Sequence, residues 1–263
     1  TRKESSAASD VYKRQLLGSR LTTRRWIVNN LLDIKELSAY YTKDKMVLNS
    51  CDFNIGQNEV LALVGSNGSG KTTLIKTIMD IHPGFKVDDV SFMGVKSDFK
   101  NQDFKKSRIA VFSDDRAFRY WSFWEYAEFL HKLYGKDIDQ DYLDSLIKGF
   151  NFNKYEDYIL KDLSMGNAKK FYIIAALGLK LSLLVLDEPV DGLDFESTVF
   201  LYQELKAYKK FGSIFMSTHI LESINEVADA YILLHDGKIS EKKQITEKLS
   251  ADEIMSSFGA KDV

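Results

Sequence analysis

The amino-acid sequence predicts an α/β fold with a mainly parallel sheet, an N-terminal antiparallel β subdomain and an inserted α-helical subdomain. Three observations support this prediction. Short apolar runs alternate with segments of helical periodicity along most of the chain, which is typical of parallel strands joined by helices. Residues 31–55 have a strand-like pattern. Residues 115–162 instead combine aromatic and acidic residues at helical spacing, without β-branched runs.

The composition is that of an ordinary globular protein. The 263 residues are 44% hydrophobic and 28% charged, a balance that can form a core without disulfides or metals. The formal net charge is -2, and lysine pairs such as Lys105 and Lys106 fit solvated helix faces, so no nucleic-acid partner is expected. Cys51 is the only cysteine, which excludes an internal disulfide and fits a reducing compartment.

The first half of the chain divides into strands and one clear helix. Strands are expected at residues 31–37 and 46–55, and the continuous apolar run at 60–64 is typical of a buried parallel strand. A glycine-rich turn follows this run, and a helix is expected over 71–80, ended by Pro83 and Gly84. Short strands are expected near 90–93 and 109–112.

The second half returns to alternating helices and strands after residue 162. We expect helices from Ser164 and at 197–208 and 221–227, and strands at 183–186, 213–216 and 231–234. The longest apolar stretch, residues 171–186, is interrupted by Lys180 and Ser182. It falls short of the roughly 20 residues needed to cross a bilayer. We therefore interpret it as a buried helix followed by a buried strand.

Residues 1–25 differ from the rest of the chain. They are basic and polar, and they contain no apolar periodicity and no hydrophobic segment of the kind found in a secretory signal. We expect a disordered tail or a non-native extension there. Residues 26–263 are expected to form the functional domain.

A phosphate-binding loop is predicted between the strand at 60–64 and the helix that follows it. The pattern G-x-x-x-x-G-K-[ST] is matched in full by Gly65, Ser66, Asn67, Gly68, Ser69, Gly70, Lys71 and Thr72, with Thr73 following. Glycines let the backbone approach phosphate oxygens, and the helix N-terminus favours an anion. Lys71 adds a positive charge, and the Thr72 hydroxyl suits Mg²⁺. The sequence therefore predicts the core of a P-loop NTPase.

Two carboxylates follow the apolar strand at 183–186. Asp187 and Glu188 come at the carboxyl end of this strand, where ligands bind in open α/β sheets. Asp187 is predicted to belong to the Mg²⁺ site. Glu188 is predicted to accept a proton from the attacking water, a role worth roughly 10²- to 10⁴-fold in rate.

Further motifs in fixed order resemble those of the ABC ATPases. Residues 163–167, Leu-Ser-Met-Gly-Asn, resemble the LSGGQ signature, and residues 190–194 resemble the D-loop that ends in Asp194. His219 resembles the switch histidine of the family. Tyr41 lies where the family places an aromatic residue that stacks on adenine, with Tyr40 as the alternative. The resemblance covers residues 31–240; without it, the signature segment would be only a capped helix start.

The resemblance implies an ATP-hydrolysing domain that acts in pairs. In the family, Ser164 and Gly166 would contact the γ-phosphate bound to a second ABC ATPase subunit, identical or different, so that two ATP molecules lie between head-to-tail domains. His219 would contact the γ-phosphate and orient the water. The resemblance further implies a separate transmembrane permease subunit, a cytoplasmic position on the inner face of the membrane, and export in preference to import.

One position departs from the family pattern. The family usually has Gln, sometimes Glu, at the junction between the core and the helical subdomain, whereas residues 112–115 here are Phe-Ser-Asp-Asp. Asp114 is the best match and could contact Mg²⁺ or water. Its side chain is shorter and charged, so we expect this departure to affect the coupling between ATP and the helical subdomain and not the ATP site itself.

An aromatic cluster begins the helical subdomain. It comprises Phe118, Tyr120, Trp121, Phe123, Trp124, Tyr126 and Phe129. Part of it must be core, and an exposed part would mark an interface, where the family receives its permease.

Two other functions of the chain remain as alternatives. One is a soluble ABC ATPase that acts on a ribosome, on DNA or on iron–sulfur assembly; the other is a small-molecule kinase, which would leave the signature unexplained.

Overall fold

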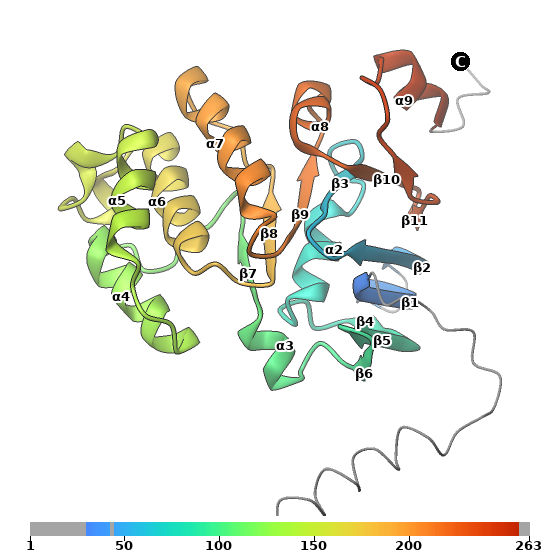
Figure 1. Cartoon of the computed structure of the whole chain (residues 1–263). Coiled ribbons are helices and arrows are strands. Elements are labelled where there is room, and N and C mark those ends of the chain that lie inside the picture. Colours follow the sequence, from blue (N-terminus) through green and yellow to red (C-terminus); the bar gives the residue numbers. More distant parts are fainter. Residues whose placement is uncertain (1–29, 43–44, 258–263) are drawn as a thin grey trace, which may run out of the picture.

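The structure is a computed structural model that describes residues 30–42 and 45–257. The predicted extension at residues 1–25 lies outside the described residues. Figure 1 shows a central sheet with an antiparallel β layer beside one part of it and a group of helices at its other end. Within the described residues, no helix combines the length and apolar character that crossing a bilayer requires.

The central sheet carries the elements around the phosphate loop. Its strand order is β11-β10-β3-β9-β8-β7, and the five strands from β10 to β7 are parallel. Their bounds are Val60–Val64 for β3, Arg108–Val111 for β7, Leu183–Asp187 for β8, Ser213–Thr218 for β9 and Ala230–His235 for β10. The short strands β11 (Lys238–Ile239) and β12 (Lys243–Gln244) both pair antiparallel with β10. The predicted mainly parallel sheet is confirmed.

The core lies on both faces of this sheet. Alternate residues of a strand point to opposite faces. Val60, Ala62 and Val64 pack into the core shared with the helical part of the chain. Leu61 and Leu63 pack into a second core on the side of the antiparallel layer. Burial on both faces explains why β3 is a continuous apolar run rather than an alternating one.

Antiparallel strands form the second layer. Their order is β2-β1-β5-β6, with β4 also paired to β1, and the bounds are Asn30–Thr42 (β1), Lys45–Gly56 (β2), Phe85–Lys86 (β4), Asp89–Phe92 (β5) and Val95–Ser97 (β6). The long β1–β2 hairpin contains several register shifts. The predicted strand at 46–55 matches β2 to within one residue at each end. The register shifts interrupt the side-chain alternation of β1, which accounts for its prediction ending at residue 37.

Helices cover the sheet and extend beyond its edge at β7. Those outside the helical group are α2 (Lys71–Ile78), α3 (Gln102–Lys106), α7 (Phe195–Tyr208), α8 (Leu221–Val227) and α9 (Ala251–Ser257). The predicted helices at 71–80, 197–208 and 221–227 are confirmed apart from one or two residues at their ends. The short elements β4, β6, α3, β11, β12 and α9 were not predicted.

The helical group comprises α4 (Phe123–Tyr134), α5 (Gln140–Gly149), the 3₁₀ turns Asn153–Tyr155 and Leu160–Asp162, and α6 (Met165–Gly178). In Figure 1, α4, α5 and α6 lie together beyond β7. Ser122 precedes α4, and its backbone N–H donates to the Glu125 carboxylate at 2.7 Å. Ser164 caps α6 by accepting from the backbone N–H of Asn167 at 3.3 Å. Both helices therefore begin at serines with local hydrogen-bond partners.

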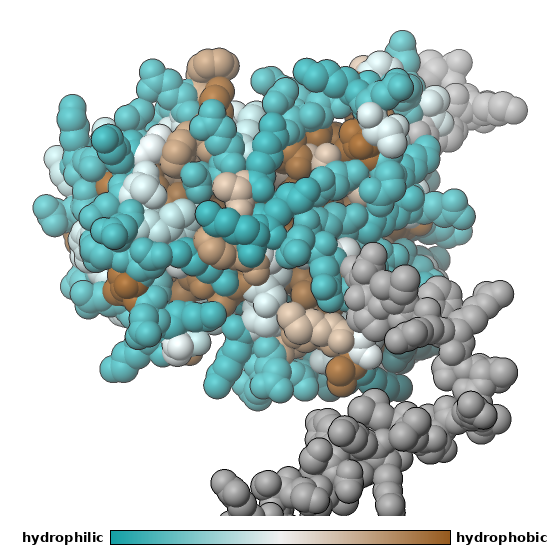
Figure 2. Space-filling view, in the orientation of Figure 1, coloured by the Kyte–Doolittle hydropathy of each residue, from teal (hydrophilic) through white to brown (hydrophobic). Residues whose placement is uncertain are grey.

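The aromatic cluster divides between core and surface. Phe123 and Tyr126 are buried, whereas Trp121, Trp124 and Phe129 are half-buried against the same core. Phe118 and Tyr120 are exposed, by 36% and 70%. On the face seen in Figure 2, hydrophilic residues predominate and hydrophobic residues form separate small patches.

Candidate functional site

At two positions, the loop between β3 and α2 has a backbone conformation that only glycine adopts readily. Gly68 and Gly70 have φ values of 82° and 109°, in the region that disfavours a side chain. Lys71, the first residue of α2, donates from Nζ to the backbone oxygens of Gly65 at 2.8 Å and Ser66 at 3.2 Å. The loop therefore curls around the lysine ammonium at the N-terminus of α2, an arrangement suited to an anion.

A cavity of about 460 Å³ opens beside this loop. It brings together eight of the predicted site residues: Tyr41, Asn67, Gly68, Gly70, Lys71, Thr72, Thr73 and Glu188. Four lining residues were not predicted as site residues: Lys45, Val47, Ser113 and Asp191. Lys45 and Val47 come from β2, where no sequence motif indicates a binding residue. The other predicted site residues are not among the lining residues: Gly65, Ser66, Ser69, Asp114, Ser164, Gly166, Asp187, Asp194 and His219.

The carboxylate of Asp187 is held by hydroxyl groups. Its Oδ2 accepts from the Thr72 hydroxyl at 2.8 Å, and its Oδ1 accepts from the Ser217 hydroxyl of β9 at 2.6 Å. The Ser113 hydroxyl lies 3.4 Å from Oδ2. Thr72, Asp187 and Ser113 therefore present three hard oxygens at one place, which is the ligand type that Mg²⁺ takes. Asp114, the predicted counterpart of the family Gln, is exposed.

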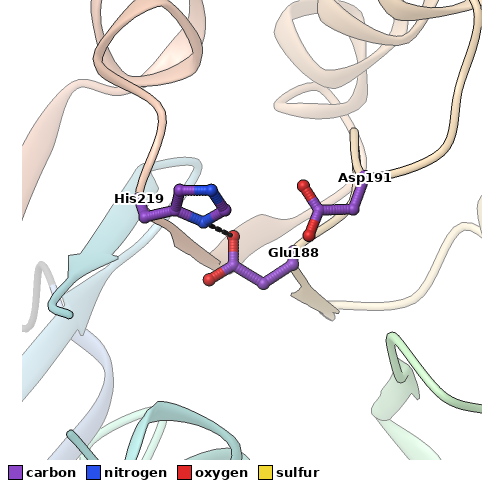
Figure 3. A group of neighbouring side chains, drawn as sticks. All are labelled: Glu188, Asp191 and His219. Carbon is purple, nitrogen blue, oxygen red and sulfur yellow. Dashed lines mark hydrogen bonds and ion pairs between the residues drawn. The ribbon is translucent and has the colours of Figure 1, made fainter. Parts of the chain in front are cut away.

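Glu188 lies between a lysine and a histidine. Its Oε1 is 3.1 Å from Lys71 Nζ, and its Oε2 is 3.0 Å from His219 Nδ1. Figure 3 shows the imidazole of His219 and the carboxylate of Asp191 on different sides of Glu188. One side-chain atom of each of these three residues lies within 4.8 Å of the other two. The predicted base and the predicted switch histidine are thus in direct contact.

Asp191 could not be distinguished from Asp194 by sequence alone, because both belong to the D-loop motif. The structure gives them different surroundings. Asp191 lines the cavity, whereas Asp194 caps α7, accepting from the backbone N–H of Ser197 at 2.8 Å. Asp194 also accepts from Lys170 Nζ at 2.7 Å, and this bond is the main reason that the pKa of Asp194 is lowered to about 2.

The start of α6 is pressed against the D-loop. A Cβ atom built on Gly166 would lie 2.4 Å from the backbone oxygen of Gly192. The nearby Met165 side chain is 76% exposed. The two motifs therefore meet within one chain, while the exposed start of α6 lies outside the cavity.

Tyr41 lies at the cavity and is 61% exposed. Its hydroxyl is 3.4 Å from that of Thr73, and its ring contacts the ring of His82 edge-on at 5.0 Å. Tyr40 is half-buried and its backbone oxygen lies 3.0 Å from Nε2 of His82. Of the two candidates, Tyr41 is the one that lines the cavity.

Comparisons with known proteins identify the family of the chain. The sequence model of the family described as "ABC transporter" matches residues 48–191. The chain is 32% identical over 225 residues to the putative ABC transporter ATP-binding protein AlbC of Bacillus subtilis, covering 83% of this chain and 94% of that protein. It is 29% identical over 214 residues to the SkfA peptide export ATP-binding protein SkfE of the same species, covering 80% and 87%.

A solved structure described as the ATP-binding subunit of an ABC transporter superposes with a TM-score of 0.74 at 27% identity, covering 87% of this chain and 93% of that one. Other matching relatives are named as import proteins. The fold is that of the P-loop NTPases, and the family binds and hydrolyses ATP. Taken together, the ordered motifs, their convergence at the phosphate loop and these similarities show that the chain belongs to the ABC transporter family as an ATP-binding, ATP-hydrolysing domain.

Proposed function

We propose that the chain powers a separate membrane permease by hydrolysing ATP, and that the system works in export. The observation that carries the proposal is the contact of Glu188 with both Lys71, at 3.1 Å, and His219, at 3.0 Å, beside the phosphate loop. The phosphate loop and Lys71 bind the β- and γ-phosphates. Glu188 accepts a proton from the attacking water, and His219 holds the Glu188 carboxylate and contacts the γ-phosphate.

Residues suited to Mg²⁺ lie beside the same loop. Thr72 and Asp187 would hold the ion, with the Ser113 hydroxyl 3.4 Å from Asp187 as a further oxygen. Ser217 orients the Asp187 carboxylate through its 2.6 Å hydrogen bond. When bound, the ion would neutralise charge on the β- and γ-phosphates. Asp114 remains a second candidate for this region.

Tyr41 is proposed to stack on adenine. Its ring is exposed at the cavity that contains the phosphate loop, and Lys45 Nζ lies 5.8 Å from the ring centroid. An exposed aromatic ring offers a flat apolar surface to a planar base. The adenine would thus bind against the antiparallel layer while the phosphates bind against the central sheet.

A second ATPase subunit is proposed to complete each site. Ser164 and Gly166 do not line the cavity of their own chain, yet the capped N-terminus of α6 is exposed and suited to an anion. In a head-to-tail pair this end would face the γ-phosphate bound to the partner. Asp194 would act indirectly, by fixing the D-loop to α7 and to Lys170.

The exposed part of the aromatic cluster is proposed to receive the permease. Phe118, Tyr120 and Trp121 line a surface hollow of about 290 Å³ together with Arg116 and Arg119. Aromatic and arginine side chains are enriched at protein interfaces. Docking there would hold the chain on the inner face of the membrane. Export is supported by the similarity to the peptide export protein SkfE.

Co-purification tests the proposal. The full chain, tagged and isolated from mildly solubilised membranes, should bring down a polytopic membrane protein that raises its rate of ATP hydrolysis. Recovery with ribosomes or nucleic acid instead would contradict it. For direction, inside-out vesicles containing the complex should accumulate labelled peptides when ATP is added outside, since an exporter takes cargo from the ATP side. ATP-driven release of preloaded peptides would indicate import.

A further inference from the structure

Two adjacent lysines of α6 are buried. Lys169 and Lys170 are only 5% and 4% exposed, although lysine is almost never fully buried without a partner. Lys170 pairs with the Asp194 carboxylate at 2.7 Å. Lys169 instead donates from Nζ to the backbone oxygen of Glu188 at 3.0 Å. Neither contact could be expected from sequence spacing alone.

The backbone of Glu188 is strained and is held on both sides. Its φ is 48°, in the left-handed region that a non-glycine residue keeps only where its surroundings enforce it. Its N–H donates to the Ser217 hydroxyl at 3.0 Å, and its C=O accepts from Lys169. Side chains from β9 and α6 thus fix both polar groups of this peptide.

The ammonium of Lys169 also lies among carboxylates. Burial lowers its pKa, and the nearby charges of Asp191, Asp187, Glu188 and Asp114 act in the opposite direction. A buried cation surrounded by acidic groups is stabilised by them and reduces their mutual repulsion. Lys169 does not line the nucleotide cavity, so its influence on the site passes through the loop after β8.

We infer that Lys169 is a positioning residue for ATP hydrolysis, which holds the backbone of Glu188 so that its carboxylate faces the water. This inference depends on the proposed role of Glu188 as the base. Because α6 begins at the signature motif, Lys169 also ties that motif to the catalytic loop of its own chain. Loss of the ammonium should lower kcat while leaving ATP binding intact.

The test compares matched substitutions in the full chain. Lys169→Met keeps the side-chain length and removes the ammonium, and Lys242→Met makes the same change at a largely buried lysine that pairs with Glu59 at 2.7 Å. K169M should lower kcat by about 10- to 100-fold, the range expected when a catalytic group is misplaced by about 1 Å. Its KM for ATP and its ATP affinity should stay close to wild type, whereas its Tm should fall because the surrounding carboxylates lose a buried cation. K242M should leave kcat close to wild type while lowering Tm, because the ion pair of Lys242 with Glu59 lies outside the nucleotide cavity.

A conservative variant and a double variant complete the design. K169R keeps a charged donor and should recover part of the lost kcat. In a Glu188→Gln background, K169M should cause no further loss, because both changes act on the same group. If K169M does not fold, K169Q takes its place in each comparison. Wild-type kcat in the neutral variant, or an equal fall in K242M, would overturn the inference, whereas normal turnover in E188Q would instead overturn the role of Glu188.

Discussion

The ammonium of Lys71 lies 3.1 Å from the carboxylate of Glu188, and both side chains are largely buried. The same ammonium donates to two carbonyls of the phosphate loop. Phosphate oxygens and Glu188 therefore compete for one cation. Binding of ATP would draw Lys71 toward the phosphates and leave the second oxygen of Glu188 available to a water, while His219 keeps its 3.0 Å contact with the first.

Neutralising Glu188 separates binding from turnover. Glu188→Gln keeps the shape of the side chain but cannot accept a proton, so the rate of hydrolysis should fall at least about 100-fold. ATP affinity should be unchanged or higher, because Lys71 loses an anionic competitor. Turnover by phosphate release and affinity by nucleotide titration check both parts. Glu222→Gln, on the exposed side of α8, is the control for loss of a carboxylate.

Removing the charge of Lys71 should affect ATP affinity first. A hydrogen bond to a charged group contributes roughly 1.5–3 kcal/mol, so Lys71→Met should weaken ATP binding by roughly 10- to 150-fold. Lys76→Met removes a lysine from the last turn of the same helix, away from the loop. Titration with nucleotide should show little change in that control. Equal affinities for the two variants would contradict the assignment of Lys71.

Gly166 should not tolerate a side chain. The Cβ of Gly166→Ala would lie 2.4 Å from the Gly192 backbone oxygen, so α6 or the D-loop would have to shift. We expect a stability loss of about 1–3 kcal/mol and a fall in turnover of about tenfold or more, with ATP affinity of the single chain retained. Denaturant unfolding and steady-state kinetics measure these effects. The exposed neighbour provides a control, Met165→Ala, which should leave stability within about 0.5 kcal/mol.

A substitution at Tyr120 tests the proposed permease surface without disturbing the core. Its side chain is 70% exposed, in contrast to Phe123 and Tyr126, whose truncation would damage the core. Tyr120→Ala should leave basal hydrolysis unchanged and weaken binding to the solubilised permease by roughly 5- to 30-fold, as for an interface anchor. Leu133→Ala, at another exposed apolar position of the helical group, should not weaken binding to the permease. Unchanged permease affinity in Y120A would refute this surface.

Most of the parallel core could be predicted because burial on both faces leaves a clear signal. Strand β3 is fully buried and apolar throughout, and β8 is fully buried and apolar up to its last residue, Asp187. The phosphate loop joins its strand and helix in a fixed order. Elements with fewer apolar residues were missed. Strand β6 has no buried residue and α3 has only Phe104, so neither carries a usable period.

The finer parts of the site depend on backbone turns and long-range contacts. Gly192, with φ of 82°, turns the chain between Asp191 and Asp194, and no periodicity tells which of the two faces the cavity. Ser113, rather than the neighbouring Asp114, contacts Asp187, because the chain leaves β7 in an irregular conformation. The hydrogen bond from Lys169 to the backbone oxygen of Glu188, nineteen residues away, is not predicted by any sequence pattern.

The ion pair of Asp194 with Lys170 should make the free energy of unfolding depend on pH in the acidic range. Hydrogen bonding from Lys170, and then from Ser197, lowers the pKa of Asp194 to about 2, compared with about 3.9 in an unfolded chain. A lowered folded-state pKa means that the charged form favours folding. This contribution is fully present above about pH 5 and is lost as the pH falls from about 4 toward 2.

Asp194→Asn isolates the charge, because asparagine is also a good N-cap. The Asp194 side chain is 55% exposed, so solvent screening should limit the loss to below about 1 kcal/mol at neutral pH. Denaturant unfolding of both proteins, followed by tryptophan fluorescence, should give a constant difference in free energy of unfolding from pH 7 to pH 5. The difference should then shrink toward pH 3.5, since protonated Asp194 resembles the amide. A difference that stays constant from pH 7 to pH 3.5 would show that the cap, and not the charge on Asp194, anchors the D-loop to α7.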